Sequence, residues 1–449
     1  MSHFEKILIA NRGEIARRII RTCKRLGIKT VAIYSEADID APFVNEADEA
    51  VCIGAPQAKK SYLDMDKVIE AAKQTKTTAI HPGYGFLSES PEFARRCEKE
   101  GITFIGPGAD IIAMMGSKIE ARRQMQRAGV PVVPGWDGKL DTVEEALSVA
   151  EKLGYPLMLK ASFGGGGIGM QVVYTPEELG NVYSSTMQRA LSYFGDGTLF
   201  LEKWIENPRH IEVQVACDHY GNTLHLYERE CSVQRRNQKV IEESPSPFLD
   251  EKKRLELLES ALKGVKQIGY TTIGTMEFIF DETGEFYFLE MNTRLQVEHP
   301  VTEEVTGIDL VELQIQLAAK EKMPYQQEDI KVMGHAIECR LYAEDPKTFF
   351  PSPGVIQRLV LPEKDVRLDF GVIEGNKVTP YYDPMIGKII THGANRTEAI
   401  EKMGRALQGI QVEGLTANTE LLQLVVRDSD FIQGNYTTRY LEKLLQLQV

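Results

Sequence analysis

The sequence predicts a mixed fold, α/β in its N-terminal part and α+β in the remainder. Strand and helix patterns alternate at the start of the chain, which is typical of a parallel sheet with crossover helices. A run of four glycines then interrupts a small unit near the middle of the 449 residues. Beyond it, strands follow one another across Gly-containing turns, which predicts an antiparallel sheet.

The N-terminal unit alternates between the two kinds of element. Its strands and helices are predicted at 6–10, 14–26, 30–34, 67–75, 79–80, 91–100 and 103–105. The first loop, AlaAsnArgGlyGluIle, lacks the GxGxxG spacing, so no nicotinamide dinucleotide site is inferred. The loop at 81–90 (HPGYGFLSES) follows a strand end, where open α/β sheets bind ligands; a tight Gly/Pro turn explains it equally well.

A connecting segment at 130–135, rich in proline and glycine, follows a predicted helix at 118–128 and leads into a small second unit. Its elements are predicted at 143–153, 157–161, 170–174, 176–192 and 199–202. The tip of this unit reads FGGGGIGM (163–170), and such glycines suit a backbone that approaches a polyphosphate. No GK[ST] follows, so this is not a P-loop. Lys160, just upstream, favours a phosphate-binding lid over a floppy hairpin tip.

From Trp204 onward the chain is rich in strands. They are predicted at 211–217, 223–229, 275–280, 286–291, 334–342 and 386–392, with helices at 251–268, 309–319, 397–408 and 438–445. Residues 202–205 end a strand whose backbone could hydrogen-bond to an adenine ring. His210 lies nearby, and a purely structural role is the alternative for it. The segment 230–243 (ECSVQRRNQKVIEE) is interpreted as a connection whose cations bind phosphate or bicarbonate, or else as a solvated charge run.

The strands at 275–280 and 286–291 predict a β-hairpin. A two-residue loop of Thr283 and Gly284 places Glu277 directly opposite Glu290. Like charges there repel, and a divalent cation held with the Asn292 amide oxygen relieves the repulsion. Two solvated acids are the alternative, which the apolar neighbours on both faces disfavour. A glycine cover, lysines and metal-binding acids together indicate phosphoryl transfer.

Composition narrows the function classes. A net charge of −13 argues against nucleic acid and anionic membranes. Six scattered cysteines without metal-binding spacing predict reduced thiols in a cytoplasmic protein. No signal peptide and no membrane-spanning run is predicted.

Seven motifs make the chain resemble the ATP-grasp superfamily and, within it, the biotin carboxylases. They are LIANRGEIA (8–16), HPGYGFLSE (81–89), FIGP (104–107), KASFGGGGIGM (160–170), CSVQRRNQK (231–239), EMNTRLQVEHPVTE (290–303) and ECRLYAEDP (338–346). The resemblance implies an ATP-grasp fold with a Rossmann-like N-terminal domain (1–115), a helical linker (116–131), a lid (132–203), a central part (204–330) and a C-terminal antiparallel-sheet part (331–449). It implies that ATP activates bicarbonate as carboxyphosphate, which then carboxylates biotin on a carrier protein.

Site residues carry over from the same motifs. ATP contacts are expected from Lys118, Lys160, Gly166, Gly167, Glu202, Lys203, Trp204, Ile205, His210, Gln234, Asn237, Glu277 and Glu290. Two Mg²⁺ or Mn²⁺ ions are expected on Glu277, Glu290 and Asn292, and bicarbonate on Lys239, Arg294, Gln296 and Val297. Catalysis is assigned to Arg294, Glu298 and Lys239, with Glu298 as the base, and biotin binding to Arg340 and Tyr84. A resting Arg294–Glu298 salt bridge is the plainer alternative.

Some features depart from the family or leave a question open. Ile168 and Asn237 replace residues that are often basic, and Phe163 replaces a small one, which affects ATP affinity more than chemistry. Because no biotin-bearing segment follows the last predicted helix, we expect the carrier and the carboxyltransferase to be separate chains, and we expect a homodimer. Another acylphosphate-forming ligase and a non-catalytic nucleotide sensor are the competing hypotheses. The final carboxyl acceptor is open, between acetyl-, propionyl- and methylcrotonyl-CoA and pyruvate.

Overall fold

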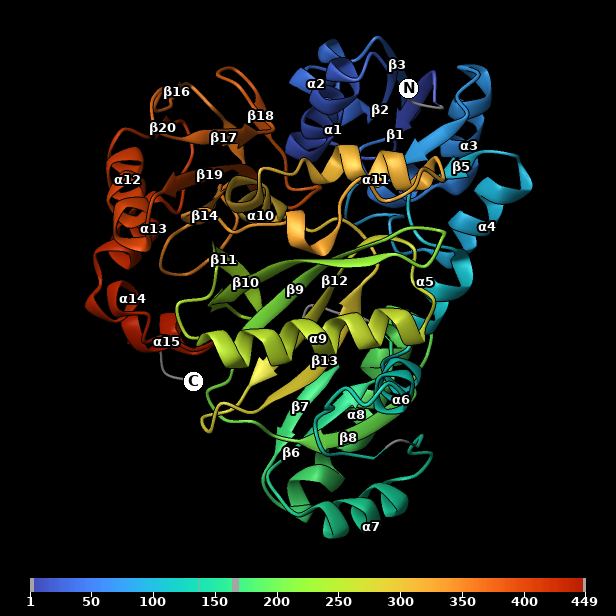
Figure 1. Ribbon diagram of the computed structural model, residues 1–449, viewed down its shortest axis with the longest axis vertical. Coiled ribbons are helices and arrows are strands. Elements are labelled where there is room, and N and C mark those ends of the chain that lie inside the picture. Colours follow the sequence, from blue (N-terminus) through green and yellow to red (C-terminus); the bar gives the residue numbers. More distant parts are fainter. Residues whose placement is uncertain (1–3, 137, 164–168, 447–449) are drawn as a thin grey trace.

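The computed structural model describes residues 4–136, 138–163 and 169–446. A parallel N-terminal sheet, a small lid sheet and a long antiparallel sheet form its three main layers (Figure 1). The lid, with α7, lies at the bottom of Figure 1, and the N-terminal and C-terminal parts lie side by side at the top.

The N-terminal part is the predicted α/β unit, with strand order β3-β2-β1-β4-β5 and parallel pairing throughout. Asp64 and Ser90 accept the N–H groups that begin two of its helices. Its elements are β1 (Lys6–Ile9), α1 (Gly13–Arg25), β2 (Lys29–Ser35), α2 (Pro42–Glu46), β3 (Glu49–Gly54), α3 (Met65–Gln74), β4 (Ala79–His81), α4 (Pro91–Lys99) and β5 (Thr103–Phe104).

Two helices, α5 (Ala109–Gly116) and α6 (Lys118–Arg127), lead to the lid. The lid is a three-stranded antiparallel sheet, ordered β7-β6-β8, which buries Leu157, Leu159 and Leu201. Its elements are α7 (Val143–Leu153), β6 (Leu157–Ala161), β7 (Met170–Val173), α8 (Pro176–Phe194) and β8 (Leu199–Lys203). The predicted contacts Gly166 and Gly167, and Ile168, lie outside the described residues.

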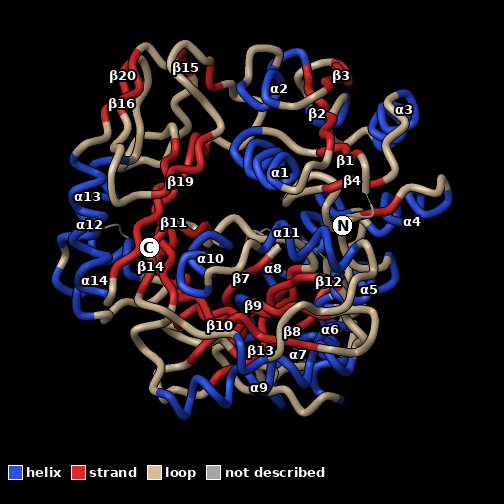
Figure 2. Tube along the Cα trace, turned by 45° about the horizontal axis from the view of Figure 1, so that its top comes forward, coloured by secondary structure: helices blue, strands red, loops and turns tan. Residues whose placement is uncertain are grey.

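The long sheet has eight antiparallel strands in the order β13-β12-β9-β10-β11-β14-β19-β17, which Figure 2 shows as one red band. This sheet joins the central and C-terminal parts, which the sequence analysis divides between residues 330 and 331, because β11 pairs with β14. Its strands are β9 (Arg209–Cys217), β10 (Thr223–Arg235), β11 (Gln238–Ser244), β12 (Thr272–Phe280), β13 (Phe286–Asn292), β14 (His335–Tyr342), β17 (Arg367–Phe370) and β19 (Met385–Gly393).

Period-two alternation divides the faces of this sheet. Val213 on β9 and Met276 and Phe278 on β12 pack with Leu257 and Val265 of α9 in one apolar core. The intervening Glu212 and Glu277 therefore point to the opposite face, where the charged side chains gather. The helices around the sheet are α9 (Glu251–Gln267), α10 (His299–Thr306) and α11 (Leu310–Ala318).

The C-terminal part adds helices and two short ribbons to the far end of the sheet. They are α12 (Arg396–Gln408), α13 (Thr419–Arg427), α14 (Ser429–Gln433), α15 (Tyr440–Leu444), β15 (Gly354–Val355) with β18 (Lys377–Val378), and β16 (Arg358–Val360) with β20 (Gln411–Glu413). Within the described part of the chain, no helix combines the length and the apolar character needed to cross a membrane.

The hairpin register is as predicted at the acids, but its loop is not. The two-residue loop is wrong, because Phe280 faces Phe286 and the Asp281 N–H donates to the Glu285 carbonyl at 2.9 Å. The Asp281 carboxylate accepts the N–H of Glu285, and Gly284 takes a φ of +84°, which suits a three-residue loop. A β-bulge between Glu277 and Phe278 shifts the pairing by one residue and so compensates for the longer loop. Glu277 therefore faces Glu290 as predicted.

The segment 230–243 is not the predicted connection. It forms the end of β10 and most of β11, joined by Arg236 and Asn237 with φ of +47° and +63°. Positive φ at both central residues is the type I′ geometry of a tight hairpin, which asparagine tolerates well. Asn237 is therefore explained by the turn.

Candidate active site

A cavity of ≈ 500 Å³ lies between the lid and the β12–β13 edge of the long sheet. Apolar side chains on β6, β8, β12 and β13 line it together with charged groups from both layers. The apolar ones include Met158, Phe200, Ile205, Ile279 and Leu289. The charged or polar ones include Lys118, Lys160, Glu202, Lys203, His210, Gln234, Asn237, Glu277 and Glu290. An apolar wall with a cationic and acidic lining suits an aromatic base joined to a polyphosphate.

Cations surround the opposed acids Glu277 and Glu290. Lys118 Nζ lies 2.5 Å from Glu290 Oε2, and His210 Nε2 lies 3.0 Å from Glu277 Oε2. Burial alone would lower the pKa of His210, but the Glu277 charge raises it above its ordinary value. Burial would raise the pKa of Glu277, yet Lys239 and His210 hold it well below its ordinary value. Glu277 is therefore ionised at neutral pH in this arrangement.

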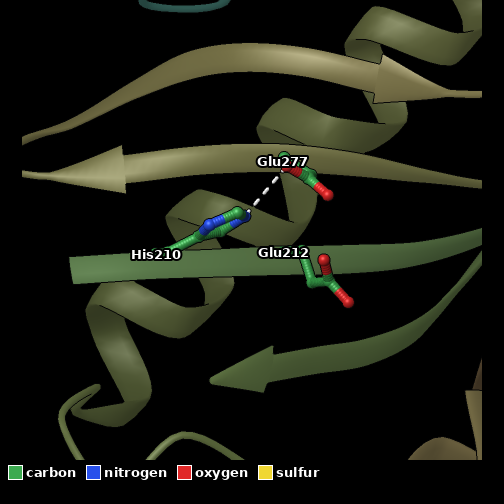
Figure 3. Close-up of side chains that lie close together, drawn as sticks. All are labelled: His210, Glu212 and Glu277. Atoms are coloured by element: carbon green, nitrogen blue, oxygen red, sulfur yellow. Dashed lines mark ion pairs between the residues drawn. The ribbon is translucent and has the colours of Figure 1, made fainter. Parts of the chain in front are cut away.

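Lys239 pairs with three carboxylates in the buried charge cluster. Its Nζ donates to Glu212 at 2.6 Å, to Glu277 at 2.9 Å and to Glu298 at 2.5 Å. Burial would lower the pKa of Lys239, but these carboxylates raise it well above its ordinary value. Figure 3 shows His210 and Glu212 on one strand beside Glu277 on the next, with ligand atoms within 4.8 Å of one another. Lys239 already pairs with both acids of that trio.

The lid contributes a second charged group. Glu202 Oε2 accepts from Lys160 Nζ at 2.5 Å, and Glu202 Oε1 accepts from Arg122 at 2.9 Å. Arg122 also donates to the Val133 carbonyl at 2.6 Å, which fixes it between α6 and the lid. Sequence reasoning missed Arg122, since it lies in a helix with no motif around it.

The Glu202–Ile205 segment, predicted to serve an adenine ring, ends β8 at the cavity. Its Lys203 and Trp204 N–H groups donate to the Pro134 and Pro156 carbonyls, and Lys203 Nζ donates to the Gly154 carbonyl at 2.7 Å. Ile205 and Trp204 line the cavity through their side chains. Gln234 lies behind them, its amide against His210 Nδ1 at 2.8 Å.

Arg294 is held in place from the N-terminal part. Its Nε donates to Glu89 Oε2 at 2.7 Å, and its second nitrogen donates to Asn292 Oδ1 at 2.7 Å. The resting Arg294–Glu298 salt bridge considered above is replaced by this Glu89 pair. Glu89 also accepts the Thr293 N–H at 3.1 Å. The loop at 81–90 is thus brought to the site, and Glu89 is a residue that sequence reasoning did not single out.

Glu298 lies between two cations. Lys239 approaches one oxygen, and the Arg340 guanidinium donates to the other at 2.8 Å. Burial would raise the pKa of Glu298, but Lys239 and Arg340 hold it well below its ordinary value. Gln296, in the same turn, donates to Glu277 at 2.8 Å.

The two remaining predicted site residues, Val297 and Tyr84, lie beside this centre. Val297 presents its carbonyl to Lys388 Nζ at 2.7 Å, and Lys388 lies 3.1 Å from Glu14. Tyr84 donates its hydroxyl to Glu14, and burial with the Glu14 charge raises its pKa well above its ordinary value. The structure therefore gathers the predicted residues that it describes around the cavity and the adjoining Glu298 centre.

Lid, antiparallel sheet and opposed acids define the ATP-grasp class of ATP-dependent ligases. Three family models match: "Biotin carboxylase, N-terminal domain" at residues 3–112, "Carbamoyl-phosphate synthase L chain, ATP binding domain" at 117–326 and "Biotin carboxylase C-terminal domain" at 338–443.

Named relatives extend this result. The chain is 56% identical over 446 residues to the biotin carboxylase of Halalkalibacterium halodurans, covering 99% of each. It is 50% identical to the mouse mitochondrial propionyl-CoA carboxylase alpha chain, covering 98% of this chain and 61% of that one. The biotin carboxylase domain dimer of Hydrogenobacter thermophilus 2-oxoglutarate carboxylase, in complex with MgADP, ADP and bicarbonate, superimposes with a TM-score of 0.96 at 48% identity, covering 99% of both chains. The chain belongs to the biotin carboxylase family.

Proposed function

We propose that this chain uses ATP and bicarbonate to carboxylate biotin attached to a carrier protein, releasing ADP and phosphate. Bicarbonate takes the γ-phosphoryl group to give carboxyphosphate. Carboxyphosphate then breaks into carbon dioxide and phosphate; the phosphate takes the N1 proton of biotin, and N1 forms a bond with carbon dioxide. The observation that carries the proposal is Glu298, buried between Lys239 and Arg340 beside an acid-lined cavity.

Bicarbonate is assigned to the Glu298 centre. Lys239, Arg294, Gln296 and Val297 are assigned to the anion, and Glu298 takes its proton. Arg294 then stabilises the oxyanion that forms on biotin. Arg340 and Tyr84 are assigned to biotin.

ATP is assigned to the ≈ 500 Å³ cavity. Lys118, Lys160 and His210 supply positive charge for the phosphates, and Glu202, Lys203, Trp204 and Ile205 are assigned to the base and sugar, with Gln234 and Asn237 near the phosphates. Gly166 and Gly167 of the glycine run are proposed to cover the phosphates through their backbone amides.

Two divalent cations, Mg²⁺ or Mn²⁺, fit the opposed glutamates. Glu277 and Glu290 offer carboxylate oxygens to one cavity, and Asn292 offers an amide oxygen now held by Arg294. Hard oxygen donors of this kind suit such ions. The ions neutralise the phosphate charge when bound.

We assign five parts to the chain, 1–115, 116–131, 132–203, 204–330 and 331–449; the separate apolar core of the lid supports the third. A separate biotin carrier and carboxyltransferase are proposed as partners. The 99% coverage of the Halalkalibacterium relative, against 61% of the propionyl-CoA carboxylase chain, supports this. A homodimer is proposed from the domain dimer of Hydrogenobacter. The six free cysteines support a cytoplasmic location.

The test is ATP cleavage with bicarbonate, measured with and without free biotin. The proposal predicts that biotin raises the rate and that Arg294→Ala removes the increase. Equal rates with and without biotin would favour another acylphosphate-forming ligase. No ATP cleavage under any of these conditions would favour a nucleotide sensor.

A further inference from the structure

A second pair of acids lies behind Arg340. Glu242 on β11 and Glu338 on β14 face each other directly across paired strands, and both are 0% exposed. Glu242 Oε1 accepts from Arg340 Nε at 2.6 Å. Among the described residues, Glu242 Oε2 and both oxygens of Glu338 have no hydrogen-bond partner. Two opposed, buried carboxylates do not both ionise at low energetic cost when a guanidinium bonds only one of them, so the pair holds a proton.

The surrounding charges show which acid keeps that proton. Burial, together with the Glu242 charge, raises the pKa of Glu338 well above its ordinary value in spite of Lys388 on β19. Burial raises the pKa of Glu242 to about 7, against Arg340 and the more distant Lys239. The other ionisable groups facing Glu242 are Glu298, from the turn before α10, and the Cys231 thiol of β10. Glu242 is thus the member that titrates near neutrality.

One guanidinium joins this pair to the proposed base. Arg340 donates to Glu242 through Nε at 2.6 Å, and its terminal nitrogen Nη2 contacts Glu242 and donates to Glu298 at 2.8 Å. While Lys239 and Arg340 both hold Glu298, it is a weak base, because each cation stabilises its ionised form. Any group that takes a larger share of Arg340 makes Glu298 more basic.

We propose that Glu242 is a positioning residue that competes with Glu298 for Arg340 and thereby sets the strength of Glu298 as the base for bicarbonate. The proposal rests on the proposed function and deepens it. Ionised Glu242 draws the guanidinium away, and Glu298 then accepts the bicarbonate proton more readily. In that step the O–H bond of bicarbonate breaks and a carboxylic O–H bond forms on Glu298. Protonated Glu242 leaves Arg340 with Glu298.

The experiment compares Glu242→Gln with the wild type between about pH 6 and 8.5, as biotin-dependent ATP cleavage under saturating ATP and bicarbonate. Glutamine imitates the protonated acid at every pH. The two rates are therefore expected to be similar near pH 6 and to differ about tenfold at pH 8.5, which corresponds to one unit in the pKa of Glu298. The ratio isolates Glu242 from all other titrating groups. A ratio that does not change with pH would overturn the proposal, because a purely structural defect gives that result.

Two further variants identify the titrating group. Glu338→Gln keeps a neutral dipole at the second acid, so the rise in rate between pH 6 and 8.5 is expected to remain. Glu243→Gln removes a buried carboxylate of the same strand that bonds His335 and Arg396, and it is expected to lower the rate by a factor independent of pH. Loss of the rise in Glu338→Gln, with its retention in Glu242→Gln, would contradict the assignment. A wild type without biotin-dependent cleavage would instead contradict the proposed function.

Discussion

Two pairs of glutamates face each other across antiparallel strands of one sheet, and they differ in what surrounds them. Glu277 and Glu290 line the cavity, and three cations approach them. Glu242 and Glu338 are completely buried, and Arg340 alone bonds to either of them among the described residues. We therefore propose that the same cross-strand arrangement holds a cation where it meets a cavity and retains a proton where it is closed.

Glu298 links the two pairs. Lys239 joins it to Glu277, and Arg340 joins it to Glu242. The proton-accepting group of the proposed reaction thus lies between an acid pair that cations approach and an acid pair that retains a proton.

Removal of the linking carboxylate is expected to have the largest effect. Glu298→Gln leaves Lys239 and Arg340 in place but removes the base, so biotin-dependent ATP cleavage is expected to fall by about 10²–10⁴-fold. The measurement is a steady-state rate on protein whose melting temperature has been checked. A loss of less than about threefold would show that Glu298 is not the base.

The cavity-facing pair is tested through its metal requirement. Glu277→Gln and Glu290→Gln each remove one ligand, so the Mg²⁺ concentration for half-maximal activity is expected to rise by about 10–100-fold. Glu285→Gln, on the exposed turn of the same hairpin, is the matched control and keeps the wild-type requirement. Unchanged Mg²⁺ dependence in both site variants would remove this pair from the metal site.

The lid lysine offers a smaller effect on the same cavity. Lys160 lies against Glu202 in the resting structure and is proposed to turn to the phosphates. Lys160→Met is expected to raise the KM for ATP by about tenfold or more, since a charge-assisted hydrogen bond contributes roughly 1.5–3 kcal/mol. Lys152→Met, on an exposed face of α7, serves as the control. An equal KM in the two variants would contradict the assignment.

The closed pair is tested through stability and not through activity. Folding raises the pKa of Glu242 from 4.5 to about 7, so ionised Glu242 destabilises the fold increasingly as pH rises through that range. As the pH rises from 5 to 8, the free energy of unfolding of Glu242→Gln is expected to increase by about 2–3 kcal/mol relative to that of the wild type. Denaturant unfolding at the two pH values measures this difference.

The pKa of its neighbour Glu243 shifts in the opposite direction on folding. His335 and Arg396 outweigh burial and lower the pKa of Glu243 from 4.5 to about 2. Its contribution to stability is present above pH 4.5 and is lost as the pH falls towards 2. Glu243→Gln should therefore be destabilised most at neutral pH. A gain for Glu242→Gln that is the same at pH 5 and pH 8 would contradict the contrast.

The residues show why some of this architecture follows from the sequence and some does not. The predicted opposition of Glu277 and Glu290 rests on a two-residue loop. The observed loop is one residue longer, and the bulge compensates for this, so the two acids still face each other. The second half of β10 and the whole of β11 were missed because Arg235, Lys239 and Glu242 make them resemble a loop. Their charges find partners elsewhere in the chain: Arg235 pairs with Glu344, just after β14, and Glu242 pairs with Arg340 of β14. Lys239 pairs with Glu212 of β9, Glu277 of β12 and Glu298 in the turn before α10.

The pairing of Arg294 shows the same limit. Glu89 lies about two hundred residues away, and the contact depends on how the N-terminal part sits against the sheet. Glu338 likewise carries no local signal, since its position opposite Glu242 depends on a strand pairing across the 330/331 division.

The most direct test follows oxygen from bicarbonate to phosphate. If bicarbonate attacks the γ-phosphoryl group and the carbon–oxygen bond then breaks, ¹⁸O-labelled bicarbonate leaves one labelled oxygen in each phosphate released during biotin carboxylation. Mass spectrometry of the phosphate measures this transfer. The account predicts one ¹⁸O atom per turnover, and phosphate without label would contradict it.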